Sequence, residues 1–326
     1  MATQFTSVAT PGIGTNTVQT AYDLILEFQL RETPVYRMWA DKRPEKQSMP
    51  GSNVVLNRYD WFDSTAVNAA KTPLNEEQDV DSTKMPATVP VTLTFNEYGF
   101  AVTRTRKLGE FSFADVDMDA ALATSAHMLD TLDELVQDVL VTGTQILFSG
   151  GQSAEGNLTS AHTLATNDVQ RAVTLLRTKK VVPWGPAELY GAGVHPHAVH
   201  DLRRTTGSGE WRLPAEYAAG FGNSAMGNSI WAGELGVYEG VRFAENTRTR
   251  RTLTGASGAA VYRSFFHGKQ ALAEGVYVEP GIVLGPVVDK LQRFRTIGWY
   301  GMLGWTLYRN EALVTTLSGS SVSALL

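Results

Sequence analysis

The chain has 326 residues, of which 43% are hydrophobic, so it can bury a sizeable core, and 19% are charged, below the ~25% typical of soluble domains. Its formal net charge of −5 argues against a protein that wraps nucleic acid, because that binding depends largely on lysine and arginine. It has no cysteine, which excludes disulfides, thiolate metal sites and cysteine nucleophiles.

The N-terminal region predicts an arm followed by a helix. The first residues contain neither the basic nor the apolar region of a secretory signal. The polar residues 1–16 predict a flexible arm, and residues 17–33 predict an amphipathic helix that ends at Pro34. The apolar residues of the helix and of the segment after it are Ala21, Leu24, Phe28, Tyr36, Met38 and Trp39. This segment has no local partner, so we expect it to pack on a distant surface such as another subunit.

Two runs rich in β-branched and aromatic residues, 52–62 and 86–106, predict strands. Pro86 and Pro90 place the start of the second run at a sheet edge or outside a sheet. The polar connection between the runs has about two dozen residues, which is long for a compact domain. The simplest arrangement is a long two-stranded arm with a polar tip that projects from the body.

The longest predicted element is a helix from about 113 to 147, which would span ~50 Å at 1.5 Å per residue. Its apolar stripe is formed by Met118, Leu122, Ser125, Leu129, Leu132, Val136 and Val139. Its other face carries Asp115, Asp117, Asp119, Asp130, Asp133, Glu134 and Asp138. These acidic residues either form a solvated face or lie against arginines from a neighbouring element or subunit.

The remaining chain mixes helices and strands. Helices are predicted at 166–181, capped by Thr166 or Asn167, and at 196–204, opening at Pro196. The other predicted elements are a strand at 187–196, a strand–turn–strand at 233–247, a strand followed by a helix at 259–275, and strands within 277–317. The longest apolar and aromatic stretch, 296–308, is shorter than the ~20 residues of a membrane helix.

Three of the six histidines, His195, His197 and His200, lie within six positions, and histidine is the commonest protein metal ligand. Glu188 and Asp201 are nearby in sequence, but their spacing does not match the H-E-x-x-H pattern of zinc hydrolases. The first hypothesis for this stretch is a histidine-rich turn from strand to helix. The alternative is a metal-dependent hydrolase, which would lose its metal in His197→Ala.

No other motif indicates an enzyme. GAGVHP lacks the third glycine of a dinucleotide fingerprint, and GGQSAEGN lacks the Lys-Ser/Thr of a phosphate loop. The basic clusters are short and are interpreted as loop or interface arginines: Arg203, Arg204, Arg248, Arg250 and Arg251. We therefore expect no catalytic residue, no cofactor and no metal, and a chain that binds copies of itself.

Four segments, in this order, resemble the major capsid protein of tailed bacteriophages, which has the Hong Kong 97-like fold. NEYGFAVTRTRKL (96–108) looks like the return strand of the family's extended loop, and LDELVQDVLVTGTQILFSGG (132–151) looks like the end of its spine helix. GVHPHAVHDLR (193–203) looks like the strand-to-helix turn of its axial domain. ELGVYEGVRFAEN (234–246) looks like the G-x-x-x-G-V-x-F-x-E stretch that follows.

The resemblance implies an α+β fold in five parts. These are an N-terminal arm at 1–45, an extended β-hairpin loop at 46–106, a peripheral domain with the spine helix at 107–159, an axial domain at 160–286, and return strands of the peripheral domain with a C-terminal tail at 287–326. It also implies self-assembly into hexamers and pentamers of an icosahedral shell around double-stranded DNA, in a virion assembled in the host cytoplasm.

The implied partners are copies of the same chain, with portal, scaffolding and decoration proteins as further candidates. DNA would be the contents of the shell, without sequence-specific binding, and no membrane is involved. The residues predicted to contact other subunits are Lys71, Glu76, Glu77, Asp79, Lys84, Tyr22, Phe28 and Trp39. The alternatives are the hydrolase at the three histidines and another virion structural protein, such as a tail or decoration subunit.

Overall fold

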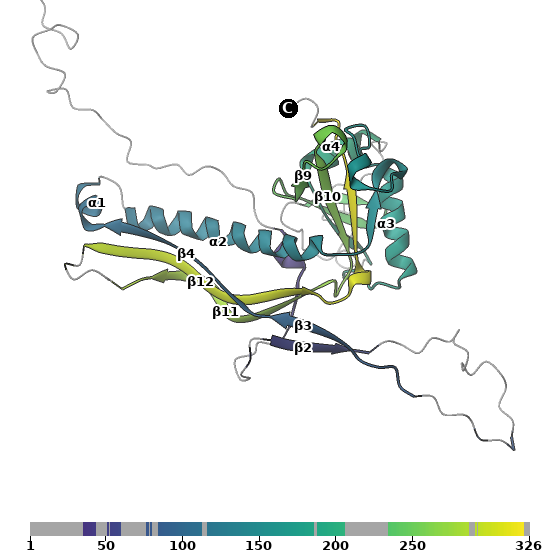
Figure 1. Cartoon of the computed structure of the whole chain (residues 1–326), viewed down its shortest axis with the longest axis horizontal. Coiled ribbons are helices and arrows are strands. Elements are labelled where there is room, and N and C mark those ends of the chain that lie inside the picture. Colours follow the sequence, from purple (N-terminus) through teal and green to yellow (C-terminus); the bar gives the residue numbers. More distant parts are fainter. Residues whose placement is uncertain are drawn as a thin grey trace, which may run out of the picture.

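The structure is a computed structural model. It describes residues 35–43, 51, 53–59, 76, 77, 79, 84–112, 116–185, 188–205, 234–286, 291 and 293–322. A compact half and an elongated half meet at one end of a long helix, and a two-stranded hairpin projects near their junction (Figure 1). Among the described residues, no helix has the length and apolarity needed to cross a membrane.

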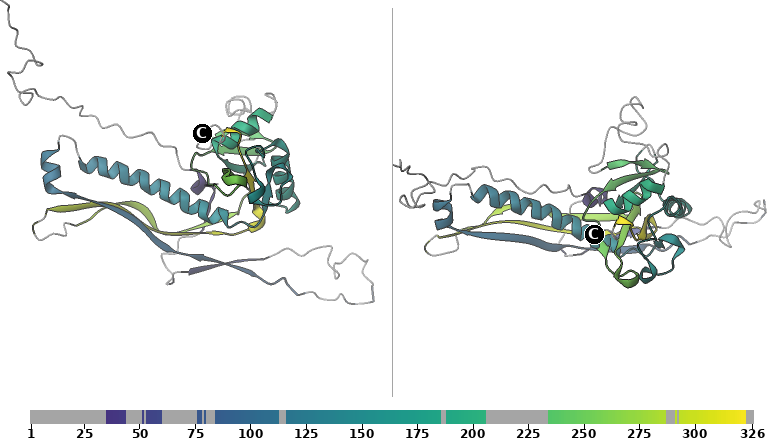
Figure 2. Two further views of the ribbon diagram at one scale, coloured as in Figure 1. Left: turned by 45° about the horizontal axis from the view of Figure 1, so that its top comes forward. Right: turned by 90° about the horizontal axis from the view of Figure 1, so that it is seen from above.

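The elongated half is a long helix lying along a four-stranded sheet (Figure 2). Helix α2 (Val116–Val141) has 26 residues, which corresponds to about 39 Å. The strand order is β1–β11–β12–β4, with β1 parallel to β11 and the other neighbours antiparallel. The bounds are β1 Asp41–Lys42, β11 Leu272–Leu284, β12 Phe294–Leu307 and β4 Asn96–Thr105, and β4 leads into the short helix α1, Arg106–Phe111.

The compact half is built on a seven-stranded sheet with the order β5–β13–β10–β6–β8–β7, in which β9 also pairs with β10. The bounds are β5 Ile146–Phe148, β6 Tyr190–Val194, β7 Glu234–Tyr238, β8 Val241–Glu245, β9 Arg251–Thr252, β10 Val261–His267 and β13 Leu313–Ser318. Helices α3 (Thr166–Thr178) and α4 (Pro196–Thr205) bury their apolar residues against Phe243 and Phe266 of this sheet.

Short 3-10 helices complete the described chain: η2 Tyr36–Trp39, η3 Ser149–Gly151, η4 Glu155–Asn157, η5 Ala256–Gly258 and η6 Asn310–Ala312.

The predicted hairpin is confirmed for residues 53–58 and 89–94. It was wrong for the second half of the run 86–106, because residues 96–105 form β4 and pair with β12 in the four-stranded sheet. Strands β2 (Asn53–Arg58) and β3 (Val89–Thr94) pair antiparallel and form a sheet of their own. Pro90 lies inside β3, opposite Asn57; a two-stranded sheet has two edges, so a proline without an N–H is tolerated there. Most of the predicted polar tip lies outside the described residues.

The two halves are joined by one shared apolar core. The C-terminal part of α2 contributes Leu132 and Val136, the η2 turn contributes Tyr36, and β10 contributes Phe265, all almost fully buried. Trp305 of β12 belongs to the same cluster. The domain ranges inferred from the resemblance stay predictions; β13 lies in the seven-stranded sheet, not beside β12.

The predicted end of the long helix was wrong. The helix ends at Val141, not near 147, because Ile146–Phe148 forms strand β5 and pairs parallel with β13. Gly143 lies at the break, where a Cβ atom would be 2.8 Å from the side chain of Leu313. Close packing against the compact sheet therefore ends a helix that local periodicity would have continued.

Two other local predictions were wrong. The helix expected near residues 268–275 is the start of strand β11, because Leu272–Val276 pairs with β12 and tertiary pairing overrides the helix preference of these residues. Helix α3 is capped by Ala165, not by Thr166 or Asn167. The Asp168 carboxylate accepts a hydrogen bond from the Ala165 N–H at 3.2 Å, so the acidic residue one turn inside the helix stabilises its start.

Replacing a leucine by alanine should affect stability differently in the two halves of α2. Leu132→Ala opens a cavity in the shared core and should lower the free energy of unfolding by about 2–5 kcal/mol. Leu122→Ala, at the exposed end of the same helix, should change it by about 0.5 kcal/mol or less. Urea unfolding of the unassembled chain measures both; equal losses would contradict the packing described here.

Candidate subunit interfaces

The three histidines lie in the turn from β6 to α4, as predicted. His195, at the end of the strand, accepts a hydrogen bond on Nδ1 from the His197 N–H at 3.1 Å. The His197 Nδ1 lies 2.7 Å from the hydroxyl of Tyr262 in β10. His200 is exposed on α4, with its Nδ1 3.5 Å from the carboxylate of Asp201. The rings of His195 and His197 therefore pack on each other, with centroids 4.7 Å apart, and both pack on Tyr262, whereas His200 is exposed.

This geometry gives His195 and His197 a packing role in the turn. Within the part of the chain that the structure describes, no three histidine, aspartate or glutamate side chains are grouped so as to hold a metal ion. Burial, together with electrostatic interactions with His197 and Arg251, lowers the pKa of His195 to about 4, so its ring is neutral at neutral pH. The His195–His197–Tyr262 contacts fix the strand-to-helix turn against β10.

The predicted contact residues fall into three groups. Tyr22, Phe28 and Lys71 lie outside the described residues. Glu76, Glu77, Asp79 and Lys84, on the connection between β2 and β3, are exposed. Trp39 is only 4% exposed, because its ring packs on Tyr36 and on His267, with centroids 5.1 and 4.3 Å away. Trp39 therefore offers little surface to a neighbouring subunit.

The acidic face of α2 is paired with arginines, as the second of the two hypotheses stated. Arg248 reaches Asp130 at 2.5 Å and Glu134 at 3.2 Å, and Arg250 reaches Asp138 at 2.7 Å. At the other end of the helix, Asp117 forms ion pairs with Arg104 of β4 and Arg295 of β12. These arginines belong to the same chain, so the acidic face helps to hold α2 on its own subunit.

Asp133 does not belong to this arginine-paired face. It is buried and accepts hydrogen bonds from the Tyr36 N–H at 2.7 Å and from the Asn246 amide at 3.1 Å. Burial raises the pKa of this carboxyl to about 6, against the opposing effect of these bonds. Asp133 thus links α2 to both the η2 turn and the end of β8.

The N-terminal half of α2 presents an exposed apolar ridge. Met118 is 63% exposed, Leu122 50% and Leu129 42%; these three residues are called the α2 ridge below. They continue the stripe that includes the buried Leu132 and Val136. The sequence predicted the stripe but not that only its C-terminal half packs within the chain.

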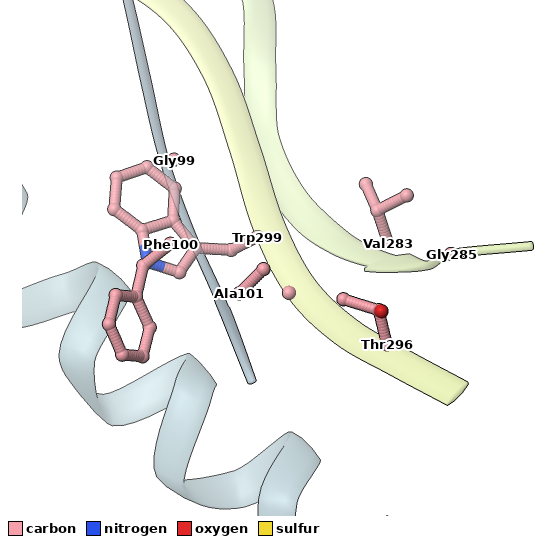
Figure 3. Close-up of a pocket in the computed structure, with 8 residues that line it drawn as sticks. Gly99, Phe100, Ala101, Val283, Gly285, Thr296 and Trp299 are labelled. Atoms are coloured by element: carbon pink, nitrogen blue, oxygen red, sulfur yellow. The ribbon is translucent and has the colours of Figure 1, made fainter. Parts of the chain in front are cut away.

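The elongated sheet also exposes apolar side chains: Phe100, Val102, Ile282, Val283, Leu284, Phe294 and Tyr300. A shallow hollow of about 310 Å³ lies on it, lined by Gly99, Phe100, Ala101, Val283, Gly285, Thr296, Gly298 and Trp299. Phe100 and Trp299 point toward α2 (Figure 3), whereas Ala101, Gly298 and Val283 are aligned on the opposite face. Exposed apolar side chains in such number on one sheet make it a candidate binding surface. The sequence feature that could have indicated this surface is the presence of apolar residues at both alternating sets of positions in the long strands.

Comparisons with known proteins show which family the chain belongs to and which solved structures share its fold. Residues 136–304 match the family model described as phage capsid protein. The chain is similar to the capsid structure of cyanophage Pam1, with 16% identity and a TM-score of 0.72 over 96% of this chain and 99% of that one. The capsid of Ralstonia phage GP4 has 13% identity and a TM-score of 0.74 over 98% of both chains. The structure from Mycobacterium phage Che8 has 15% identity and a TM-score of 0.63 over 93% of this chain and 98% of that one. No curated protein matches the chain. The expected α+β Hong Kong 97-like fold is thereby confirmed.

Two buried histidines and Asp133 predict a pH dependence of stability. His195 and His267, whose ordinary pKa is 6.5, have pKa values lowered to about 4 and about 3, mainly by burial. Below pH 6.5 the unfolded chain therefore binds protons that the folded chain does not, and stability falls as the pH falls toward these values. Asp133 opposes this trend between its ordinary pKa of 3.8 and about 6.

His267→Gln should therefore flatten the dependence of the unfolding free energy on pH, and Asp133→Asn should steepen it. Urea unfolding at several pH values between about 4.5 and 7 compares the slopes with that of the unchanged chain. Identical slopes for all three proteins would show that these groups are not buried in the states described.

Proposed function

Because the chain belongs to the phage capsid protein family and is a major capsid protein, we propose that its copies assemble as hexamers and pentamers into an icosahedral shell around double-stranded DNA. The family gives it a structural role in the virion. Assembly in the host cytoplasm, and portal, scaffolding and decoration proteins as partners, are part of the proposal.

The observation that carries the proposal is the exposed apolar surface of the elongated half. Buried apolar area contributes roughly 25 cal/mol per Å², so a surface left open on one subunit favours contact with another. The α2 ridge lies on the helix and the other exposed apolar residues lie on strands β4 and β11, so the elongated half carries more than one apolar patch. The helix and these strands run side by side (Figure 1). Contacts between unlike patches of identical subunits form rings when the rotation between neighbours closes, and a hexamer or pentamer is such a ring.

The projecting hairpin supports the same proposal. A two-stranded sheet alone is at best marginally stable in water, and Val55, Tyr59 and Met85 at or beside it are exposed. We propose that a neighbouring subunit covers this hairpin. The proposed contacts in the loop and N-terminal segment remain Lys71, Glu76, Glu77, Asp79, Lys84, Tyr22, Phe28 and Trp39, with Trp39 contributing least because its own chain already covers it.

Electron microscopy tests the proposal directly. The purified protein, imaged by negative stain and measured by light scattering after size exclusion, should form shells, tubes or free hexamers. Co-expression with a scaffolding protein from the same genome tests whether assembly needs that partner. A monodisperse small particle under both conditions would contradict the proposal.

A substitution in the α2 ridge should separate assembly from folding. Leu122→Glu places a charge on exposed apolar surface, so it should leave the free energy of unfolding nearly unchanged and reduce the yield of assembled particles about tenfold or more, because burying an unpaired charge in an interface is costly. Leu122→Met is the matched control and should assemble normally. Normal assembly of Leu122→Glu would remove the α2 ridge from the interface.

A further inference from the structure

Strand β4 is an open edge of the elongated sheet. It forms one margin of the order β1–β11–β12–β4 (Figure 2), and no described strand pairs with its outer side. Eight of its ten residues are exposed. A long exposed edge with apolar side chains is a template for pairing with another chain, which soluble proteins normally avoid.

The backbone of β4 has a defined orientation at this edge. Phe100 lies opposite Trp299 of β12. A Cβ atom on Gly99 would lie 2.9 Å from the Trp299 carbonyl oxygen, and one on Gly298 would lie 2.6 Å from that of Phe100, so both oxygens point into the β4–β12 pair. The N–H and C=O groups of successive residues in a strand point to alternate sides. Because those of Phe100 point toward β12, those of Gly99 and Ala101 point to the open edge.

The side chains of β4 are similar in kind at equal distances before and after Phe100. The residues one position away on either side are small, Gly99 and Ala101. Those two positions away are apolar, Tyr98 and Val102. Those three positions away, Glu97 and Thr103, are polar. An antiparallel copy of the strand, related by a twofold axis at Phe100, would set like opposite like at every one of these positions.

We infer that β4 of a second copy of this chain pairs antiparallel with this edge about a twofold axis at Phe100. The inference rests on the proposed self-assembly and names one of its contacts. Gly99 and Ala101 of one copy would exchange backbone hydrogen bonds with Ala101 and Gly99 of the other, and the Phe100 rings would meet at the axis. The result is one continuous sheet with both α2 helices on the same face.

Two observations select a second copy and this register. A twofold interface requires a self-complementary patch, and β4 supplies one. The ring of Phe100 stacks on His127 of α2 at 4.4 Å between centroids, so it is already held on the face where its counterpart would lie. Moving the axis by one residue would set Glu97 opposite Ala101, or Tyr98 opposite Arg104, and would lose the match.

The absence of cysteine from the chain makes disulfide trapping a clean test. Opposite residues of antiparallel strands have Cα atoms roughly 4.5–5.5 Å apart, within the roughly 4.4–6.8 Å that a disulfide spans. Phe100→Cys should therefore link two copies through a single position. The double variant Glu97→Cys/Thr103→Cys should do so at exposed positions that leave the His127 stacking intact. Glu97→Cys and Thr103→Cys alone are the matched controls, because each would be about six residues, or ~20 Å, from its own counterpart.

Each variant is oxidised, examined by electron microscopy and run on a non-reducing gel. The inference predicts covalent dimers for Phe100→Cys and for the double variant, with yields at least about fivefold above those of the single controls. Shells without these dimers would overturn the β4 contact and leave the proposed function intact. Dimers without shells would support the contact and count against the proposed function, and the absence of both would overturn both. Equal dimer yields in the single controls and the double variant would overturn the register.

Discussion

The shared core at the C-terminal end of α2 is the constraint on which the rest of the molecule depends. There Asp133 is buried and accepts the backbone N–H of Tyr36, while Tyr36 packs edge-on against Phe265 of the compact sheet and its hydroxyl lies 2.6 Å from that of Thr249. A buried carboxylate is tolerated only when such bonds satisfy it. One side chain of α2 thereby fixes the η2 turn, the helix and the compact sheet relative to one another.

This anchoring divides α2 into two environments. From Leu132 onward the helix buries its apolar residues within its own chain. Toward Met118 it contacts the sheet through the ion pairs of Asp117 and through His127, which stacks on Phe100, and its apolar ridge stays exposed. A rigid elongated half with open apolar surface can reach several neighbours while the compact half keeps its own core. Such a subunit suits a shell, because the total binding energy is the sum of many modest interfaces and no single contact has to be strong.

Local signals in the sequence predicted the β2–β3 hairpin, the strand-to-helix turn at Pro196 and the β7–β8 pair, since alternation and turn residues act over short distances. They did not predict that the long helix stops at Val141, because that depends on β5 pairing with β13 far along the chain. Nor could helical periodicity distinguish Asp133 from its exposed acidic neighbours: its burial depends on Tyr36 and Asn246. For the same reason the apolar stripe was predicted, but which half of it stays exposed on the subunit was not.

In the proposed assembly, other copies of the chain cover the open surface of the elongated half. Hydrogen–deuterium exchange, compared between assembled particles and dissociated subunits, measures whether they do. We expect amides of β4 and of the N-terminal half of α2 to gain protection on assembly, while those of β6 and β10 in the compact core stay unchanged. Unchanged exchange across β4 and residues 116–131 in well-formed shells would contradict it.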